Sequence, residues 1–221
     1  MTTAPRESRL RLPNSAKEDC HLIILLCDTP LPPSVFLPVP SYDSTDVFRR
    51  VKESYGTYHD IFESLFSKSF ALNAHDDVAG SKELIITSYN VVLSRYPSLS
   101  ALQSANALLI TGSAASAYLP IPWISDLIAY IKELPIIVPR MRILGICFGH
   151  QVIGIAFGGT CEVNSSGWEI GVRRLRLSEW GRRIWGGEIL VGDPFVRMIV
   201  RRAGSADGLG RRIYIRFIRI M

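Results

Sequence analysis

The sequence lacks any long apolar run. No stretch of its 221 residues reaches the roughly 18 uninterrupted apolar residues of a membrane-spanning helix, so we expect no membrane span. The N-terminus, MTTAPRESRLRLPNSAKEDC, is polar and charged, and it contains no apolar segment of the kind found in a secretory signal. We therefore interpret residues 1–20 as a flexible leader and expect a cytoplasmic protein that binds no membrane.

Paired cysteines are also missing. The four cysteines are Cys20, Cys27, Cys147 and Cys161, and their spacing fits neither a zinc site nor a paired redox motif. Free thiols are the default in a cytoplasmic protein. The sequence therefore predicts reduced cysteines and no metal site.

Lysine is absent from the last part of the chain. Residues 173–221 contain twelve arginines, no lysine and four acidic residues, in a chain whose formal net charge is +5. A basic segment of this kind can indicate a nucleic-acid partner. Because the sequence contains no recognised DNA- or RNA-binding motif, however, we expect no such partner.

Short apolar runs alternate with helical patterns along the chain. HLIILLCD, ELIITSYN, ALLITGS and RILGI have the pattern of buried strands, whereas ISDLIAYIKEL and GHQVIGIAFGG have the spacing of helices. Strands that alternate with helices build βαβ units and a mainly parallel sheet. The sequence therefore predicts an α/β fold whose chemistry lies at the carboxyl ends of the strands.

The stretch ILGICFGHQ places a cysteine between two glycines where a strand meets a helix. Gly145 and Gly149 stand two residues before and two residues after Cys147, as in the G-x-S-x-G nucleophile elbow. Such a turn strains the backbone of the nucleophile and leaves no room for side chains at the glycines. The start of the next helix favours a thiolate, and the N–H of Phe148 would point to where an oxyanion forms. The pattern predicts a nucleophile; the alternative is a buried cysteine in a tight turn.

The longer stretch LGICFGHQVIGIAFGG resembles the signature of the class I glutamine amidotransferases. LLITGS before it and NSSGWEIG after it are similar in order and spacing, so the resemblance covers about residues 21–177. The group resembled is the stand-alone proteins similar to the amidotransferase domain of GMP synthase, including γ-glutamyl peptidases. The resemblance implies a doubly wound, flavodoxin-like α/β fold, incomplete at its C-terminus, and an amidotransferase-like domain over residues 21–187.

The resemblance also implies hydrolysis of a γ-glutamyl amide through a cysteinyl thioester, with no cofactor. By position, Cys147 is the nucleophile, and the backbones of Gly112 and Phe148 form the oxyanion hole. Gln151 would position the substrate, glutamine or a γ-glutamyl compound, and a partner synthase could receive the ammonia. Two of these residues have an alternative explanation. Gly112 could simply permit a turn, and Gln151 could simply bond the backbone at the start of a helix.

A cysteine nucleophile normally needs a histidine as general base. The chain offers His21, His59, His75 and His150. We expect a structural role for His21 at the start of a strand, and surface positions for His59 and His75. His150 lies three residues after the cysteine, already on the helix, so its side chain is expected to turn away from the sulfur. None of the four is therefore predicted to be the base.

In the resembling family, the base comes late, in a Q-x-H-P-E-like stretch, and an earlier H-x-D-x-V segment shapes the substrate pocket. Neither stretch is found here, because no histidine follows His150. From about Glu188 the resemblance is lost. We interpret residues 188–221 as an atypical basic tail, which an out-of-frame or intron-derived translation would explain.

Two functions fit these observations. The first is a glutamine amidotransferase-like enzyme or γ-glutamyl hydrolase, whose activity the missing base would impair without abolishing it. The second is a catalytically impaired relative that binds glutamine, a γ-glutamyl compound or a partner synthase. An assay with glutamine or a γ-glutamyl peptide separates the two.

Overall fold

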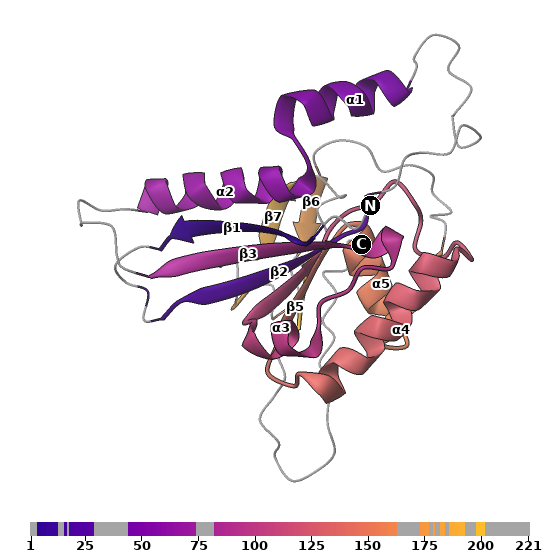
Figure 1. Ribbon diagram of the computed structural model, residues 1–221. Coiled ribbons are helices and arrows are strands. Elements are labelled where there is room, and N and C mark those ends of the chain that lie inside the picture. The colour runs from indigo at the N-terminus through magenta and orange to yellow at the C-terminus, as the bar shows by residue number, and fades with distance from the viewer. Residues whose placement is uncertain are drawn as a thin grey trace.

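A computed structural model shows a central β-sheet with helices on both faces (Figure 1). It describes residues 4–12, 16, 18–28, 44–73, 82–162, 173–176, 179, 182–183, 186–192 and 198–201. The strands are β1 (Arg6–Arg11), β2 (Cys20–Leu26), β3 (Glu83–Asn90), β4 (Ala107–Ile110), β5 (Arg142–Ile146), β6 (Arg173–Arg176), β7 (Ile189–Gly192) and β8 (Met198–Arg201). The helices are α1 (Ser44–Tyr55), α2 (Tyr58–Asn73), the 3₁₀ helix η2 (Val91–Leu93), α3 (Leu99–Ser104), α4 (Pro122–Ile137) and α5 (Phe148–Ala156).

The main sheet has six strands in the order β1-β3-β2-β4-β5-β8. The four inner strands run parallel to one another, whereas β1 and β8 are antiparallel to their neighbours at the two edges. Strands β6 and β7 form a separate antiparallel pair. This arrangement confirms the predicted mainly parallel α/β fold.

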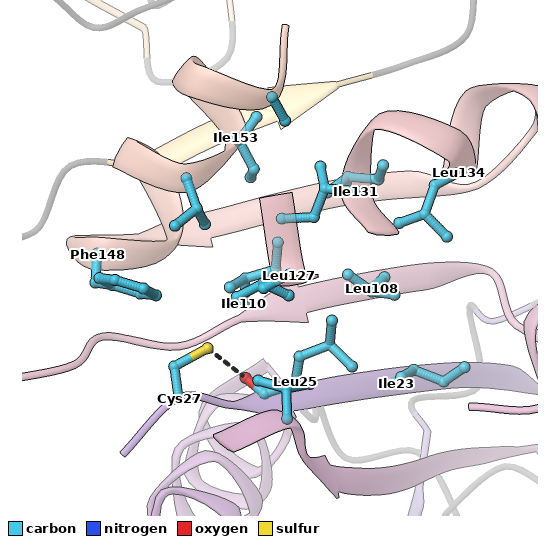
Figure 2. Close-up of a cluster of buried hydrophobic side chains, with 14 of the residues drawn as sticks. Ile23, Leu25, Cys27, Leu108, Ile110, Leu127, Ile131, Leu134, Phe148 and Ile153 are labelled. Atoms are coloured by element: carbon cyan, nitrogen blue, oxygen red, sulfur yellow. Dashed lines mark hydrogen bonds between the residues drawn. The ribbon is translucent and has the colours of Figure 1, made fainter. Parts of the chain in front are cut away.

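Alternate residues of β2 face opposite sides of the sheet, because side chains along a strand repeat every two residues. Ile23 and Leu25 join a buried cluster with residues of α4 and α5, which Figure 2 shows in close-up. Leu22 and Ile24 join a second cluster with Phe62 of α2 on the other face. Helices thus cover both faces, which makes the sheet doubly wound and explains why Leu22–Leu26 of β2 form a continuous apolar run.

Helix α4 buries one stripe of its surface against the sheet. Ile124, Leu127, Ile131 and Leu134 recur at intervals of three and four residues, and all four are buried. This spacing puts them on one face of a helix that repeats every 3.6 residues. Figure 2 shows three of them, Leu127, Ile131 and Leu134, near Ile110 and Leu108 of β4.

Strand β1 lies within residues 1–20, for which the sequence predicts a flexible leader, so that prediction is wrong for Arg6–Arg11. Leu10 pairs with Leu84 of β3 and packs against the cluster beneath α2. Arg9 bonds Glu83 of β3 across the sheet edge, at 3.3 Å from Nη1 to Oε2. A charged strand at an edge has little apolar alternation, which is why its sequence reads as a leader.

The described part of residues 188–221, predicted to be an atypical basic tail, contains the strands β7 and β8. Strand β8 is antiparallel to β5, with Met198 opposite Ile146 and Arg201 opposite Ile143. It therefore forms the edge of the main sheet beside the strand that leads to Cys147. That this segment arises from an aberrant translation stays a prediction.

Candidate active site

Cys147 occupies the one residue between the end of β5 and the start of α5. Its backbone has φ 52° and ψ −108°. Among the described residues, Ser94 is the only other residue besides glycine with positive φ. Such a conformation costs about 1–3 kcal/mol and persists only where the surrounding structure holds it. The backbone of Cys147 is therefore strained, as the sequence predicts.

The two glycines that flank Cys147 leave no room for a side chain. A Cβ on Gly145 would lie 2.4 Å from the carbonyl carbon and oxygen of Gly149. A Cβ on Gly149 would lie 2.2 Å from the carbonyl oxygen of Ile110 in β4. Real Cβ atoms do not approach backbone this closely, so the turn can form only with glycine at both positions. The expectation that both glycines are required is confirmed.

The parallel pairing of β4 and β5 brings Gly112 beside Cys147. Their carboxyl ends meet at one edge of the sheet, where Ile110 is opposite Gly145. The N–H of Gly149 donates to the carbonyl oxygen of Thr111 at 3.1 Å. A Cβ on Gly112 would lie 3.8 Å from the Cβ of Cys147. The structure thus places Gly112 next to the cysteine, and Phe148 follows the cysteine as the first residue of α5.

Gln151 ties the first turn of α5 to the loop after β4. Its side-chain Oε1 accepts a hydrogen bond from the N–H of Ala117 at 3.4 Å, and its own N–H donates to the carbonyl oxygen of Cys147 at 3.2 Å. The side chain therefore bonds backbone, as the alternative explanation expects, although the partner lies in another segment. Its role toward a substrate stays a prediction.

Cys27, at the carboxyl end of β2, is a second thiol near this edge. It is buried, and its Sγ donates a weak hydrogen bond to the carbonyl oxygen of Leu25 at 3.7 Å (Figure 2). Burial raises the pKa of the Cys27 thiol to about 12, so it stays protonated at neutral pH. A buried, protonated thiol is a poor nucleophile, whereas Cys147 is half-buried. Cys147 is the better candidate of the two.

Three of the four histidines lie in the described part of the chain, and His75 lies outside it. His21 is half-buried at the start of β2, where its Nε2 bonds the hydroxyl of Thr87 at 2.9 Å, so the predicted structural role is confirmed. His150 lies on α5 and is 8% exposed.

The prediction that His59 lies on the surface is wrong. Its side chain is 1% exposed, because α2 packs over β1 and β2. Its Nδ1 bonds the hydroxyl of Ser88 in β3 at 2.9 Å, and its Nε2 bonds the hydroxyl of Ser8 in β1 at 2.7 Å. His59 thus joins the helix to two strands. The sequence hides this role because Ser8 belongs to the strand that reads as a leader.

Burial of His59 makes the stability of the fold sensitive to acid. Burial lowers the pKa of His59, and Arg6 lowers it further, while Glu63 and Asp60 act in the opposite direction. The unfolded chain, with a histidine pKa near 6.5, therefore takes up a proton more readily than the folded one. We expect the free energy of unfolding, measured in urea, to fall as the pH drops from 7.5 to 5. A His59→Gln variant should be less stable by about 1–3 kcal/mol at pH 7.5 and show a shallower decline.

The control for this prediction is His21→Gln, because burial also lowers the pKa of His21. It measures the share of the pH dependence that comes from His21. If His59→Gln kept the full slope of the wild-type protein, His59 would not be the group that titrates.

A further side chain at the site was not singled out by the sequence. The hydroxyl of Tyr58, the first residue of α2, would lie 3.2 Å from a Cβ on Gly112. Some fifty to ninety residues separate Tyr58 from Gly112 and Cys147 along the chain, and only the packing of α2 on the sheet brings it close. No local pattern in the sequence marks it.

The family comparison agrees with this geometry. The model for the family described as glutamine amidotransferase class-I matches residues 82–193, which is just over half of the chain. The chain belongs to the class I glutamine amidotransferase family. The matched segment of this amidotransferase-family protein runs from β3 through the turn at Cys147 to the end of β7, and it includes Gly112 and Gln151.

Curated proteins similar to this chain include glutamine amidotransferase-like proteins and gamma-glutamyl peptidases. A glutamine amidotransferase-like protein of Schizosaccharomyces pombe is 29% identical over 174 residues, which cover 78% of this amidotransferase-family chain and 61% of the yeast protein. Gamma-glutamyl peptidase 2 of Arabidopsis thaliana is 30% identical over 127 residues, which cover 58% of this chain and 45% of the plant protein. The chain thus spans about half the length of the curated relatives it matches. No solved structure gives a significant match.

Two further properties concern the described part of this amidotransferase-family chain. None of its described helices is both long enough and apolar enough to cross a membrane. Among the same residues, no group of three or more His, Cys, Asp or Glu side chains is placed to hold a metal ion.

Proposed function

We propose that this chain is a cysteine-dependent γ-glutamyl hydrolase of the amidotransferase type. In this reaction the sulfur of Cys147 attacks the γ-carbonyl carbon of glutamine or a γ-glutamyl compound. A carbon–sulfur bond forms, the carbon–nitrogen bond breaks, and the amine leaves with the proton that the thiol gives up. Water then cleaves the thioester, which releases the γ-carboxylate and restores the thiol.

The backbone of Cys147 is the observation that carries this proposal. A cysteine that only fills space has no need of a positive φ, nor of a glycine two residues away on either side. A strained residue on a sharp strand-to-helix turn is what the nucleophile elbow requires, because the strain lifts the nucleophile above the sheet edge. The position of the turn, at the carboxyl ends of β4 and β5, agrees with where α/β proteins bind ligands.

The neighbours of Cys147 would supply the rest of the chemistry. The N-terminus of α5 carries a partial positive charge, which favours the thiolate. The N–H groups of Gly112 and Phe148 would donate to the oxygen that gains charge when the sulfur attacks. Gln151, fixed by its bond to Ala117, would position the γ-glutamyl group. The ammonia would be released or passed to a partner synthase.

A second candidate is a relative that binds glutamine or a γ-glutamyl compound without hydrolysing it. It is favoured by two of the described histidines, which are held by other side chains. His21 is engaged by Thr87, and His59 is engaged by Ser8 and Ser88. A cysteine without a general base would form or hydrolyse the thioester slowly.

An assay on the wild-type protein tests the proposal. We expect L-glutamine or a γ-glutamyl dipeptide to be hydrolysed, and the α-glutamyl dipeptide of the same composition to remain intact. Mass spectrometry of the acid-quenched protein should show a γ-glutamyl adduct on Cys147, because the reaction passes through a thioester. Binding of the γ-glutamyl compound in calorimetry, with neither turnover nor adduct, would favour the second candidate. Absence of both binding and turnover would exclude both.

A further inference from the structure

Tyr58 and Cys147 face the same space at the sheet edge. The point at which a Cβ of Gly112 would stand is 3.2 Å from the hydroxyl oxygen of Tyr58 and 3.8 Å from the Cβ of Cys147. Helix α2 begins at the end of the sheet where the parallel strands finish (Figure 1). Because Gly112 has no side chain, it places no atoms between the phenol of Tyr58 and the side chain of Cys147. A molecule that reaches the sulfur over Gly112 therefore also meets the hydroxyl of Tyr58.

The start of α2 holds Tyr58 in place. Both the N–H and the hydroxyl of Thr57 donate to Oδ2 of Asp60, each at 2.7 Å, and Asp60 also pairs with Arg6 of β1. The ring of Tyr58 stacks on that of Phe62, with 6.4 Å between centroids, and Phe62 is buried against the sheet. The phenol therefore approaches the cysteine from a fixed helix start, which gives it a defined position.

The surroundings of Tyr58 keep its hydroxyl protonated. Burial raises the pKa of Tyr58, and negative charge on Asp28 and Cys147 raises it further. A phenol with a raised pKa keeps its proton at neutral pH, so it has an O–H to donate in a hydrogen bond. Near a cysteine nucleophile, the group that needs such a donor is the carbonyl oxygen under attack.

We propose that the Tyr58 hydroxyl is a catalytic group of this site, which donates a hydrogen bond to the carbonyl oxygen of the molecule that Cys147 attacks. In this step the carbon–sulfur bond forms, the π electrons of the carbonyl move onto its oxygen, and the phenol keeps its proton while bonding that oxygen. The inference rests on the proposed role of Cys147 as nucleophile. It adds a side-chain donor from α2 to the backbone donors of Gly112 and Phe148.

Two thiol reagents separate this role from a structural one. The first is the chloromethyl ketone that replaces the amide nitrogen of L-glutamine with CH2Cl, whose carbonyl oxygen gains charge when a thiolate attacks. The second is iodoacetamide, which a thiolate displaces at the iodomethyl carbon, so no charge develops on its carbonyl oxygen. For Tyr58→Phe, we expect the rate at which the ketone labels Cys147 to fall about tenfold or more, and the iodoacetamide rate to stay within about twofold of wild type.

Tyr55→Phe is the matched control, because Tyr55 ends α1 with an exposed side chain and lies three residues away in the chain. It should change neither rate. Tyr58→Phe keeps the ring that stacks on Phe62, so its thermal midpoint should match that of the wild-type protein. Equal ketone rates in Tyr58→Phe and wild type would overturn the proposal, as would an equal fall with both reagents.

Chloroacetone distinguishes failure of this inference from failure of the proposed function. If the wild-type protein reacts no faster with the glutamine ketone than with chloroacetone, it does not recognise a γ-glutamyl group, and the proposed function fails. The role of Tyr58 is then judged on chloroacetone alone, which also gains charge on a carbonyl oxygen. A Tyr58→Phe variant that slows with chloroacetone but not with iodoacetamide supports the role, and one that slows with neither excludes it.

Discussion

Replacing Gly149 by alanine is expected to break the turn at Cys147. The new Cβ would lie 2.2 Å from the carbonyl oxygen of Ile110, a backbone atom in the centre of the sheet that cannot move aside as a flexible side chain could. Either α5 shifts away from β4 or the ladder between β4 and β5 is disturbed. We expect a loss of about 3 kcal/mol in the free energy of unfolding, measured in urea, and loss of the selective labelling of Cys147.

Gly158→Ala is the matched control, because it lies two residues after α5 and a Cβ there would meet nothing within 4 Å. Its φ of +86° still opposes a side chain, so we expect a loss of about 1 kcal/mol and unchanged labelling of Cys147. Equal stability of the two variants would contradict the close approach of α5 to β4 at Gly149.

Replacing Cys147 by serine is expected to lower the rate of γ-glutamyl hydrolysis by at least about 10³-fold. It should also abolish labelling by the glutamine ketone. A serine hydroxyl is close in size to the thiol but does not ionise at neutral pH, so it is a much weaker nucleophile than a thiolate. The fold should persist, because the side chain is half-buried and the strain belongs to the backbone. Turnover and intact mass after labelling measure the two effects.

Cys20→Ser is the control for this loss. Cys20 is also half-buried, but it lies at the amino end of β2, and burial raises the pKa of its thiol. The variant should keep both the activity and the labelling of the wild-type protein. Equal turnover in Cys147→Ser and the wild-type protein would exclude Cys147 as the nucleophile.

The parts of the fold that could be predicted are those whose signals are local. Leu22–Leu26 of strand β2 form an unbroken apolar run because both faces of the strand are covered. The turn at Cys147 can be recognised in the sequence from Gly145 and Gly149 alone. A side chain at either position would clash with backbone atoms, so the requirement for glycine does not depend on which side chains lie nearby. These two features were enough to place the candidate nucleophile at the carboxyl end of a parallel sheet.

The parts that could not be predicted depend on which elements pack together. Strand β1 is charged, and its place at the edge depends on pairing with β3, more than seventy residues away along the chain. Once that strand is missed, the helix that packs over it has no visible partner, and His59 reads as a surface residue. Tyr58 is missed for the same reason, because its distance to Gly112 depends on how α2 sits on the sheet.

The backbone of Cys147 has a consequence for the history of this chain. Glycine adopts φ 52° and ψ −108° with the least strain, whereas a residue with a side chain is strained there and lowers the stability of the fold. If a lineage stopped using the thiol, mutation to glycine at this position would relieve the backbone strain. If Cys147 is the nucleophile that we propose, selection for its sulfur would keep a cysteine at this unfavourable torsion. Among close homologues, the residue at position 147 would then reveal which lineages still rely on that chemistry.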